Sequence, residues 1–350
     1  MHLTQKDKAV AERTDPTSSG FSRRTFIANA SALSAASLLG VSRPLAAEPP
    51  PEVKKIRLVH TTAICLSPQY IAEELLRLEG FSTIEYVDTP VAKGLTLVEA
   101  GRADMTMGAA PDVVAALDAG RGVVPLAGIH AGCYELFVNG RIAAIKDLKG
   151  RSVVITTEDS TERLFVSSIV AYVGVNPRDI QWITTSSAAD AMQRFSEGKA
   201  DAFLAFAPQP QELRAKKVGR VVLNTTHDRP WSQYFCCMFN ARHEFVERYP
   251  VATRRALRAI LKAADLCARE PERAARFLVA KGYEPRYDLA LEVLKDLPYR
   301  RWRDADPEDT LRFHALRLHE VGIIQSSPQK LLAQRADWRF LNELRRELKT

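Results

Sequence analysis

The most reactive side chains in this sequence belong to five cysteines: Cys65, Cys133, Cys236, Cys237 and Cys267. Cysteines can form disulfides, bind metal ions or act as nucleophiles. No Cys-x-x-Cys pair and no cysteine–histidine spacing typical of a metal site occurs, so the spacing predicts no metal and no cofactor. The odd number leaves at least one thiol unpaired within the chain. Three arrangements stay open: a bridge between Cys65 and Cys133, a bridge between Cys133 and Cys236, and five buried thiols without any bridge.

Side chains for hydrolytic catalysis do not form a recognisable pattern. The sequence has no Gly-x-Ser-x-Gly motif, and no acid or nucleophile is paired with a histidine in the sequence. His60 and His130 follow predicted strands, where a histidine more often supports the fold than reacts. The sequence therefore predicts a protein that binds and is not an enzyme.

The residues best suited to binding a ligand lie in loops that precede helices. In open α/β sheets, ligands bind beyond the carboxyl ends of the strands, where helix starts offer unpaired N–H groups. This rule selects four loops and two crossings between sheets: residues 62–67, 108–112, 156–160, 206–209, 131–135 and 231–234. The four loops contain no lysine or arginine. The predicted ligand contacts are Ala63, Ile64, Cys65, Ser67, Ala109, Ala110, Cys133, Tyr134, Thr157, Ser160, Phe206, Trp231 and Tyr234.

Several of these side chains also suit purely structural roles. Thr157 and Ser160 are suited to helix capping, and Trp231 is suited to an ordinary core position. Glu158 and Asp159 would disfavour an anion if they faced the ligand, but would only complement the helix dipole if they faced away. We therefore expect a small organic solute held by aromatic faces and a few hydrogen bonds, with its charge left open.

Strands and helices alternate along the part of the chain that must position these loops. Residues 56–60 alternate between apolar and polar side chains and begin the first of three strand–helix units, which extend to residue 120. Residues 123–129 form a continuous apolar run, as in a parallel sheet covered on both faces. The alternation restarts at residues 152–155 and ends at residues 218–223, and the chain after Arg242 is predicted to be helical.

Short motifs in these elements resemble those of the two-lobed periplasmic solute-binding proteins of ABC importers. The similar branch handles nitrate, aliphatic sulfonates, taurine and thiamine precursors. Residues 68–72 resemble its proline-opened first helix, and residues 101–104 and 198–201 resemble its Gly-x-Ala-Asp turns. Residues 145–150 resemble the start of its second lobe, and residues 245–250 resemble its Phe-x-x-x-x-Pro helix start.

The resemblance, which covers residues 55–285, implies an α/β fold of the type II periplasmic-binding-protein class. Each lobe is then a doubly wound sheet, and a helical C-terminal tail packs on the larger lobe. Residues 53–139 and 238–350 are expected to form the larger lobe, and residues 140–237 the smaller lobe with the return crossing. The implied protein is a monomer that delivers a small organic ligand to an ABC permease in the inner membrane. A sensor component that presents its ligand to a receptor is the alternative.

A fungal enzyme that makes the thiamine pyrimidine has the same fold and resembles the region of Cys236 and Cys237. The lysine that holds its cofactor and the histidine that it consumes match positions occupied here by Ala110 and Val114. Neither side chain can form a Schiff base or donate ring atoms. The resemblance to this enzyme therefore implies the fold and not the reaction.

Residues 1–47 resemble a bacterial twin-arginine signal peptide. Arg23 and Arg24 precede a weakly apolar run that is too short to cross a bilayer, and a cleavage site is expected near residues 45–47. The resemblance implies export by the twin-arginine machinery to the periplasm, with an uncleaved anchor as the alternative. The net charge of +7 is no argument for nucleic-acid binding, because most basic residues of the mature part lie among acids on predicted helices.

Overall fold

The computed structural model describes residues 48–61, 63–89 and 93–349. The predicted signal peptide and its twin arginines lie outside the described residues. No helix in the described ranges is long and apolar enough to cross a membrane. Residues 50–350 form one unit that contains two five-stranded sheets.

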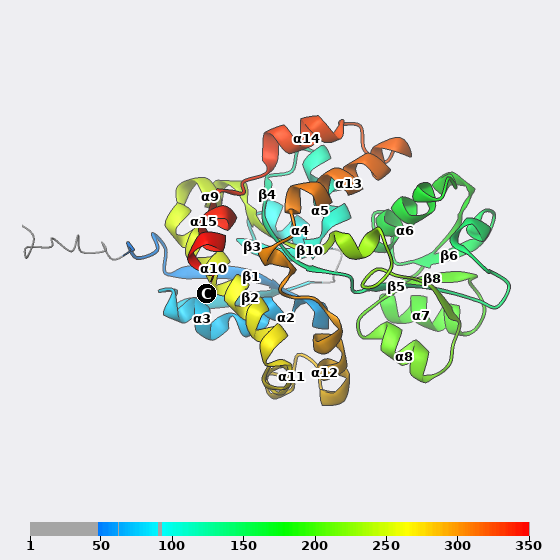
Figure 1. The fold of residues 1–350 in the computed structure, drawn as a ribbon, viewed down its shortest axis with the longest axis horizontal. Coiled ribbons are helices and arrows are strands. Elements are labelled where there is room, and N and C mark those ends of the chain that lie inside the picture. Colours follow the sequence, from blue (N-terminus) through cyan, green and yellow to red (C-terminus); the bar gives the residue numbers. More distant parts are fainter. Residues whose placement is uncertain (1–47, 62, 90–92, 350) are drawn as a thin grey trace, which may run out of the picture. The chain divides into compact units, whose positions relative to one another are not determined.

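The first sheet has the strand order β2–β1–β3–β10–β4 (Figure 1). Strand β1 runs parallel to β2 and β3, whereas β10 lies antiparallel between β3 and β4. Every residue of β4 is buried, as the continuous apolar run predicts for a strand covered on both faces. The strands are β1 (Lys55–His60), β2 (Thr83–Asp88), β3 (Met105–Ala109), β4 (Val123–Ala131) and β10 (Phe235–Arg242).

Helices cover both faces of this sheet. Leu58 and Val59, which point to opposite faces of β1, belong to two separate apolar clusters. One cluster includes side chains of α2, α3 and α10, and the other includes side chains of α4, α5 and α13. The helical elements that come before β4 are η1 (Ile64–Leu66), α2 (Ser67–Ile71), α3 (Glu73–Leu78), α4 (Gly94–Glu99) and α5 (Ala110–Asp118).

The second sheet has the strand order β7–β6–β8–β5–β9. Strand β6 is parallel to β7 and β8, and β5 is antiparallel to β8 and β9. The strands are β5 (Tyr134–Val138), β6 (Ser152–Ile155), β7 (Gln181–Thr184), β8 (Ala202–Phe206) and β9 (Arg220–Asn224). The helical elements are η3 (Ile145–Leu148), α6 (Thr161–Tyr172), η4 (Pro177–Asp179), α7 (Ala188–Ser196), α8 (Gln209–Ala215) and η5 (Trp231–Gln233).

The chain crosses from the first sheet to the second at residues 132 and 133. Gly132 has a φ of +76°, and a Cβ atom there would lie 2.2 Å from Thr226 Oγ1, so the turn requires glycine. Strand β5 pairs with β8 and β9, so it belongs to the second sheet. The crossing therefore precedes the boundary at residue 139 that the sequence predicts, because nothing within an apolar strand indicates which sheet it joins.

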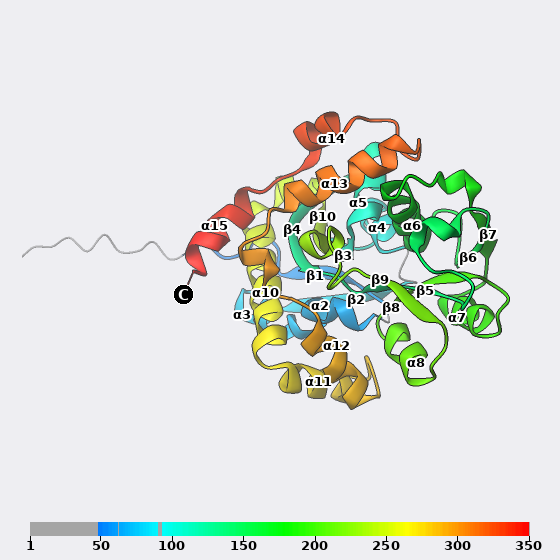
Figure 2. The same cartoon turned by 45° about the vertical axis from the view of Figure 1, so that its right-hand side comes forward.

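The C-terminal helices pack on the first sheet, as the sequence predicts (Figures 1 and 2). Helix α10 contacts α2 and α3, where Arg258 Nε donates to the buried carboxylate of Glu79 at 2.8 Å. Helix α13 contacts α5 and also α6 of the second lobe. The tail consists of α9 (His243–Arg248), α10 (Pro250–Arg269), α11 (Pro271–Ala280), α12 (Tyr287–Asp296), η6 (Arg301–Arg303), α13 (Pro307–Glu320), α14 (Pro328–Arg335) and α15 (Arg339–Glu347).

Candidate functional site

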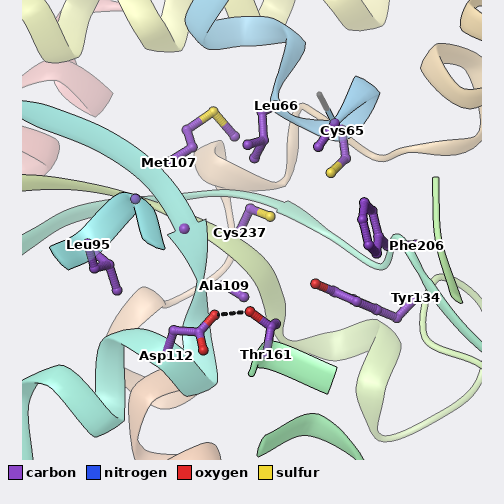
Figure 3. A pocket seen from close by; sticks show the side chains of 13 residues that line it. Cys65, Leu66, Leu95, Met107, Ala109, Asp112, Tyr134, Thr161, Phe206 and Cys237 are labelled. Carbon is purple, nitrogen blue, oxygen red and sulfur yellow. Dashed lines mark hydrogen bonds between the residues drawn. The ribbon is translucent and has the colours of Figure 1, made fainter. Parts of the chain in front are cut away.

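A cavity lies between the two sheets, beside the ends of β3, β5 and β8 (Figure 3). Its volume is about 500 Å³, part of which is open to solvent. A cavity of this size fits a small solute. Its lining consists of Ala63, Cys65, Leu66, Gly94, Leu95, Met107, Gly108, Ala109, Asp112, Tyr134, Thr161, Phe206 and Cys237.

Asp112 is the only aspartate, glutamate, histidine, lysine or arginine among these lining residues, and its side chain joins the two lobes. It lies in the first turn of α5, and its Oδ2 accepts a hydrogen bond of 2.6 Å from Thr161 Oγ1 at the start of α6 (Figure 3). Burial raises the pKa of Asp112 to about 7, the negative charge of Glu162 adds to the rise, and the hydrogen bond from Thr161 opposes it. Near neutral pH this side chain therefore exchanges between a carboxylate that accepts and an acid that donates.

Two aromatic rings form the wall that the second lobe contributes. Tyr134 and Phe206 are register partners on β5 and β8, and their ring centroids lie 6.0 Å apart. Phe165 of α6 supports Tyr134 from behind at 4.7 Å. The hydroxyl of Tyr134 points into the cavity in Figure 3, and burial raises its pKa well above the usual value, so the hydroxyl stays neutral. The wall thus offers two apolar faces and one hydroxyl.

The first lobe contributes an apolar and sulfur-rich wall. Cys65 and Leu66 lie in η1, and Met107 lies on β3. The buried amide of Gln69 fixes their spacing, because its Nε2 donates to Val59 O of β1 and its Oε1 accepts from Met107 N at 2.7 Å. No lysine or arginine is among the lining residues of the described chain. The cavity therefore has a carboxyl group but no fixed cation to hold an anion.

Five of the predicted contact residues lie in the cavity lining: Ala63, Cys65, Ala109, Tyr134 and Phe206. Ala63, Cys65, Ala109 and Phe206 lie where a strand ends and a helical element follows, which is the relation that the sequence rule uses. Tyr134 instead begins β5, directly after the crossing between the sheets.

The remaining predicted contacts of the helix starts have partners within the protein. Ser67 Oγ donates to Ile64 O at 2.5 Å, and Ile64 itself is buried. Thr157 Oγ1 donates to Asp159 at 2.7 Å. Ser160 caps α6 by accepting from the N–H of Arg163 at 3.3 Å. Ala110 is completely buried at the start of α5.

The predicted aromatic contacts of the return crossing lie away from the cavity lining. Trp231 is 4% exposed and packs edge-on against Phe313 of α13 at 5.1 Å. Tyr234 stacks on the same ring at 4.1 Å. Both residues therefore attach the crossing to the C-terminal tail, and whether either one contacts a ligand stays a prediction.

Sequence reasoning did not single out eight lining residues, including Asp112 and Thr161. Asp112 falls within the predicted loop 108–112, but an acid in the first turn of a helix is common for electrostatic reasons alone. Leu66 and Gly108 also fall within the predicted loops 62–67 and 108–112, although neither is among the predicted contacts. The other four have no such signal, because they reach the cavity only through the pairing of distant strands and helices: Gly94, Leu95, Met107 and Cys237.

The acids at the start of α6 pair with cations and do not line the cavity. Asp159 forms an ion pair of 3.1 Å with Lys93 across the two lobes, and Glu158 forms one with Arg163. A second bridge between the lobes joins Arg214 to Glu292 at 3.1 Å. These contacts and the Asp112–Thr161 hydrogen bond hold the lobes together around the cavity in this conformation.

Four of the five cysteines meet on one side of the cavity. Cys65 and Cys237 line it, and Cys133 and Cys236 lie behind, with their sulfur atoms 2.9 Å apart. All five cysteines are buried and unbridged. One ring nitrogen of His130 and the sulfur atoms of Cys65, Cys133 and Cys237 all lie within 4.8 Å of one another. The spacing rule predicts no metal site because these residues come from four separate segments of the chain.

Comparisons with known proteins agree with this architecture. The family model described as NMT1/THI5 like matches residues 83–274. The periplasmic nitrate-binding protein NrtA from Synechocystis PCC 6803 superposes with a TM-score of 0.74 at 15% identity, covering 86% of this chain and 90% of that chain. The alkanesulfonate-binding protein SsuA from Xanthomonas axonopodis pv. citri, bound to MOPS, gives 0.68 at 17% identity, with 84% and 100% covered.

A third solved structure, the periplasmic aliphatic sulphonate binding protein SsuA from Escherichia coli, gives a TM-score of 0.64 at 18% identity, covering 80% of this chain and 92% of that chain. No curated protein matches the sequence. At these identities the structural likeness establishes a shared two-lobed fold.

Proposed function

Because the chain belongs to the NMT1/THI5-like family, we propose that it is the solute-binding component of an ABC importer. It captures a small organic solute between its lobes in the periplasm and delivers it to a permease in the inner membrane. The observation that carries this proposal is the cavity enclosed between the sheets, lined from both of them. The likeness to periplasmic proteins named for nitrate and sulfonate binding supports it.

Release of the solute requires the lobes to separate. The two crossings, at residues 132–133 and 231–234, are the hinge in this proposal, and the contacts between Asp112 and Thr161 and between Lys93 and Asp159 break on opening. The smaller lobe then begins at β5 and the larger lobe resumes at β10. The twin arginines at residues 23 and 24 support export to the periplasm as a folded or folding chain.

The lining favours binding over catalysis. Ala110 and Val114 are fully buried, and neither can hold a cofactor as a Schiff base. The cavity walls consist of aromatic, aliphatic and thiol groups around a single carboxyl group, which is the composition of a small-molecule binding site. We therefore propose that the protein does not turn its solute over.

The charge of the cavity restricts the solute. At 4 Å from an ionised Asp112, an anionic group would be disfavoured by about 4 kcal/mol at an effective dielectric constant of about 20. A cationic or neutral group that donates hydrogen bonds gains from the same carboxylate. We therefore propose a small cationic or neutral organic solute, in contrast to the anions in the names of the similar structures.

A thermal-stability screen of the solute-free protein tests this proposal. Panels of cationic, neutral and anionic solutes of similar size are added, and a bound solute raises the midpoint of thermal unfolding by mass action. Stabilisation should come from the cationic or neutral panel and weaken in Asp112→Asn. Asp309→Asn is the matched control, since Asp309 is also an acid in the first turn of a helix but is exposed. Stabilisation by anions alone, or conversion of the bound solute, would contradict the proposal.

A further inference from the structure

Four potential metal ligands converge beside the cavity from four separate segments. Cys65 comes from η1, His130 from β4, Cys133 from the crossing between sheets, and Cys237 from β10. Their ligand atoms lie within 4.8 Å of one another, and all four residues are buried. We propose that these residues, the thiol–histidine cluster, bind one zinc ion with tetrahedral coordination. Cys65 and Cys237 also line the solute cavity, but the zinc site does not depend on the solute function proposed above.

The ring of His130 is prepared for a metal ion. His130 is completely buried, and its Nδ1 lies 3.2 Å from the carbonyl oxygen of Ala131. An N–H on Nδ1 donates to that carbonyl and leaves the lone pair on Nε2. Among the described residues Nε2 has no hydrogen-bond partner, although burying an unpaired polar atom is unfavourable. A histidine whose second nitrogen donates to a backbone carbonyl is the usual arrangement at zinc sites.

The backbone fixes the positions of two further ligands. Cys237 is opposite His130 in the pairing of β10 with β4, so the sheet itself brings a thiol and an imidazole together. Cys133 has a φ of +93°, a left-handed conformation that is uncommon for any residue except glycine. This conformation follows Gly132 at the crossing and places the Cys133 thiol beside the other sulfur atoms. The cluster is therefore held together by the fold before any ion arrives.

The dimensions and donor types select zinc. With sulfur about 2.3 Å and nitrogen about 2.0 Å from zinc, tetrahedral ligand atoms are separated by about 3.5 to 3.8 Å. The largest separation of 4.8 Å in the cluster therefore needs to shrink by about 1 Å on binding. Three thiolates and one imidazole form a closed structural zinc set, whereas magnesium and calcium require oxygen donors, which this set lacks.

Binding changes the protonation state of the cluster. Each thiol that coordinates zinc loses its proton, so three protons are released and the occupied site carries one net negative charge. Zinc affinity should therefore fall as the pH is lowered. Cys236, whose sulfur lies 2.9 Å from that of Cys133, is the competing partner. An external disulfide could oxidise these two thiols to a Cys133–Cys236 bridge by thiol–disulfide exchange and would itself be reduced to two thiols. The bridge would remove Cys133 from the metal site, so the zinc-bound and bridged forms exclude each other.

Metal titration of the full chain, reduced and stripped of metal, tests the proposal. Zn²⁺ is titrated against a coloured chelator, and Co²⁺ is titrated separately to detect thiolate-to-cobalt charge transfer and the visible bands of tetrahedral cobalt. We expect one ion per chain. Cys237→Ser and His130→Gln should each weaken binding at least about tenfold, because even the loss of a supporting residue costs that much at zinc sites. Cys267→Ser is the matched control, since Cys267 is buried in α10 outside the cluster and should leave binding unchanged.

X-ray absorption of the zinc-loaded wild-type chain avoids any folding defect in the variants. The proposal predicts three sulfur neighbours and one nitrogen neighbour around the ion. A shell made of oxygen and nitrogen, or the absence of stoichiometric zinc binding by the reduced chain, would overturn it. Protein isolated from its own cells with a Cys133–Cys236 bridge and without zinc would also overturn it.

Discussion

The half-buried carboxyl group of Asp112 should make the stability of the ligand-free protein depend on pH. Its pKa rises from 3.8 to about 7 on folding, mainly through burial. Between about pH 4 and pH 7 the folded protein therefore binds a proton that the unfolded chain does not. The free energy of unfolding should fall as the pH rises through this window. A rise of about three pKa units corresponds to at most about 4 kcal/mol, and the partial exposure of Asp112 reduces this value.

Asp112→Asn removes the titrating group while keeping a side chain of similar shape. Urea unfolding of the wild type and the variant at about pH 5 and pH 8 measures the effect. The variant should gain stability relative to the wild type as the pH rises, by about 1 to 4 kcal/mol. Burial also raises the pKa of Glu162, but this group is present in both proteins and its contribution largely cancels in the comparison. Asp309→Asn should follow the wild type. If Asp112→Asn also follows it, Asp112 is not a buried acid of the cavity and the account of the solute's charge fails.

Two further pairs of substitutions test the cavity and the packing of the tail. Tyr134→Ala removes a cavity wall and should weaken the binding of a solute from the stabilising panel at least tenfold, or about 1.4 kcal/mol, as measured by calorimetry. Trp231→Ala should mainly lower the free energy of unfolding, by about 3 to 5 kcal/mol. An equal loss of affinity in both variants would contradict the placement of Trp231 outside the cavity. Glu79→Ala leaves the buried guanidinium of Arg258 without its main carboxylate and should cost about 3 to 5 kcal/mol of unfolding free energy. Glu74 is exposed on α3, which ends just before Glu79, so Glu74→Ala should cost less than about 1 kcal/mol. A similar cost for both glutamates would refute this explanation of the ion pair.

Local sequence signals were sufficient to predict the alternation of strands and helices. The continuous apolar run before His130 is the fully buried β4, and Pro250 starts α10. Pairing between distant segments has no such signal. Strand β10 enters the first sheet between β3 and β4 more than 100 residues after them, and the assignment of β5 to the second sheet depends on its contacts with β8 and β9. These choices are made by burial in the whole fold and not by local propensity.

The same distinction applies to the site. The loops at helix starts could be selected from sequence, because the carboxyl ends of strands meet at one edge of a sheet. The sequence could not predict which side chain of a loop reaches the cavity. Ser160 and Asp112 both occupy helix starts, yet Ser160 caps its own helix and Asp112 accepts a hydrogen bond from the other lobe. The convergence of Cys65, Cys133 and Cys237 with His130 is invisible to spacing rules, which detect only ligands that are close in sequence.

Native mass spectrometry of the protein isolated from the periplasm of its own cells weighs the solute that the cavity carries. The ions are compared before and after mild unfolding, so that any bound molecule is weighed and its charge is determined. We expect one small organic molecule per chain that is cationic or neutral, and we expect the Asp112→Asn variant to carry less of it. A bound oxyanion, or a molecule that the purified protein converts to a product, would contradict the account.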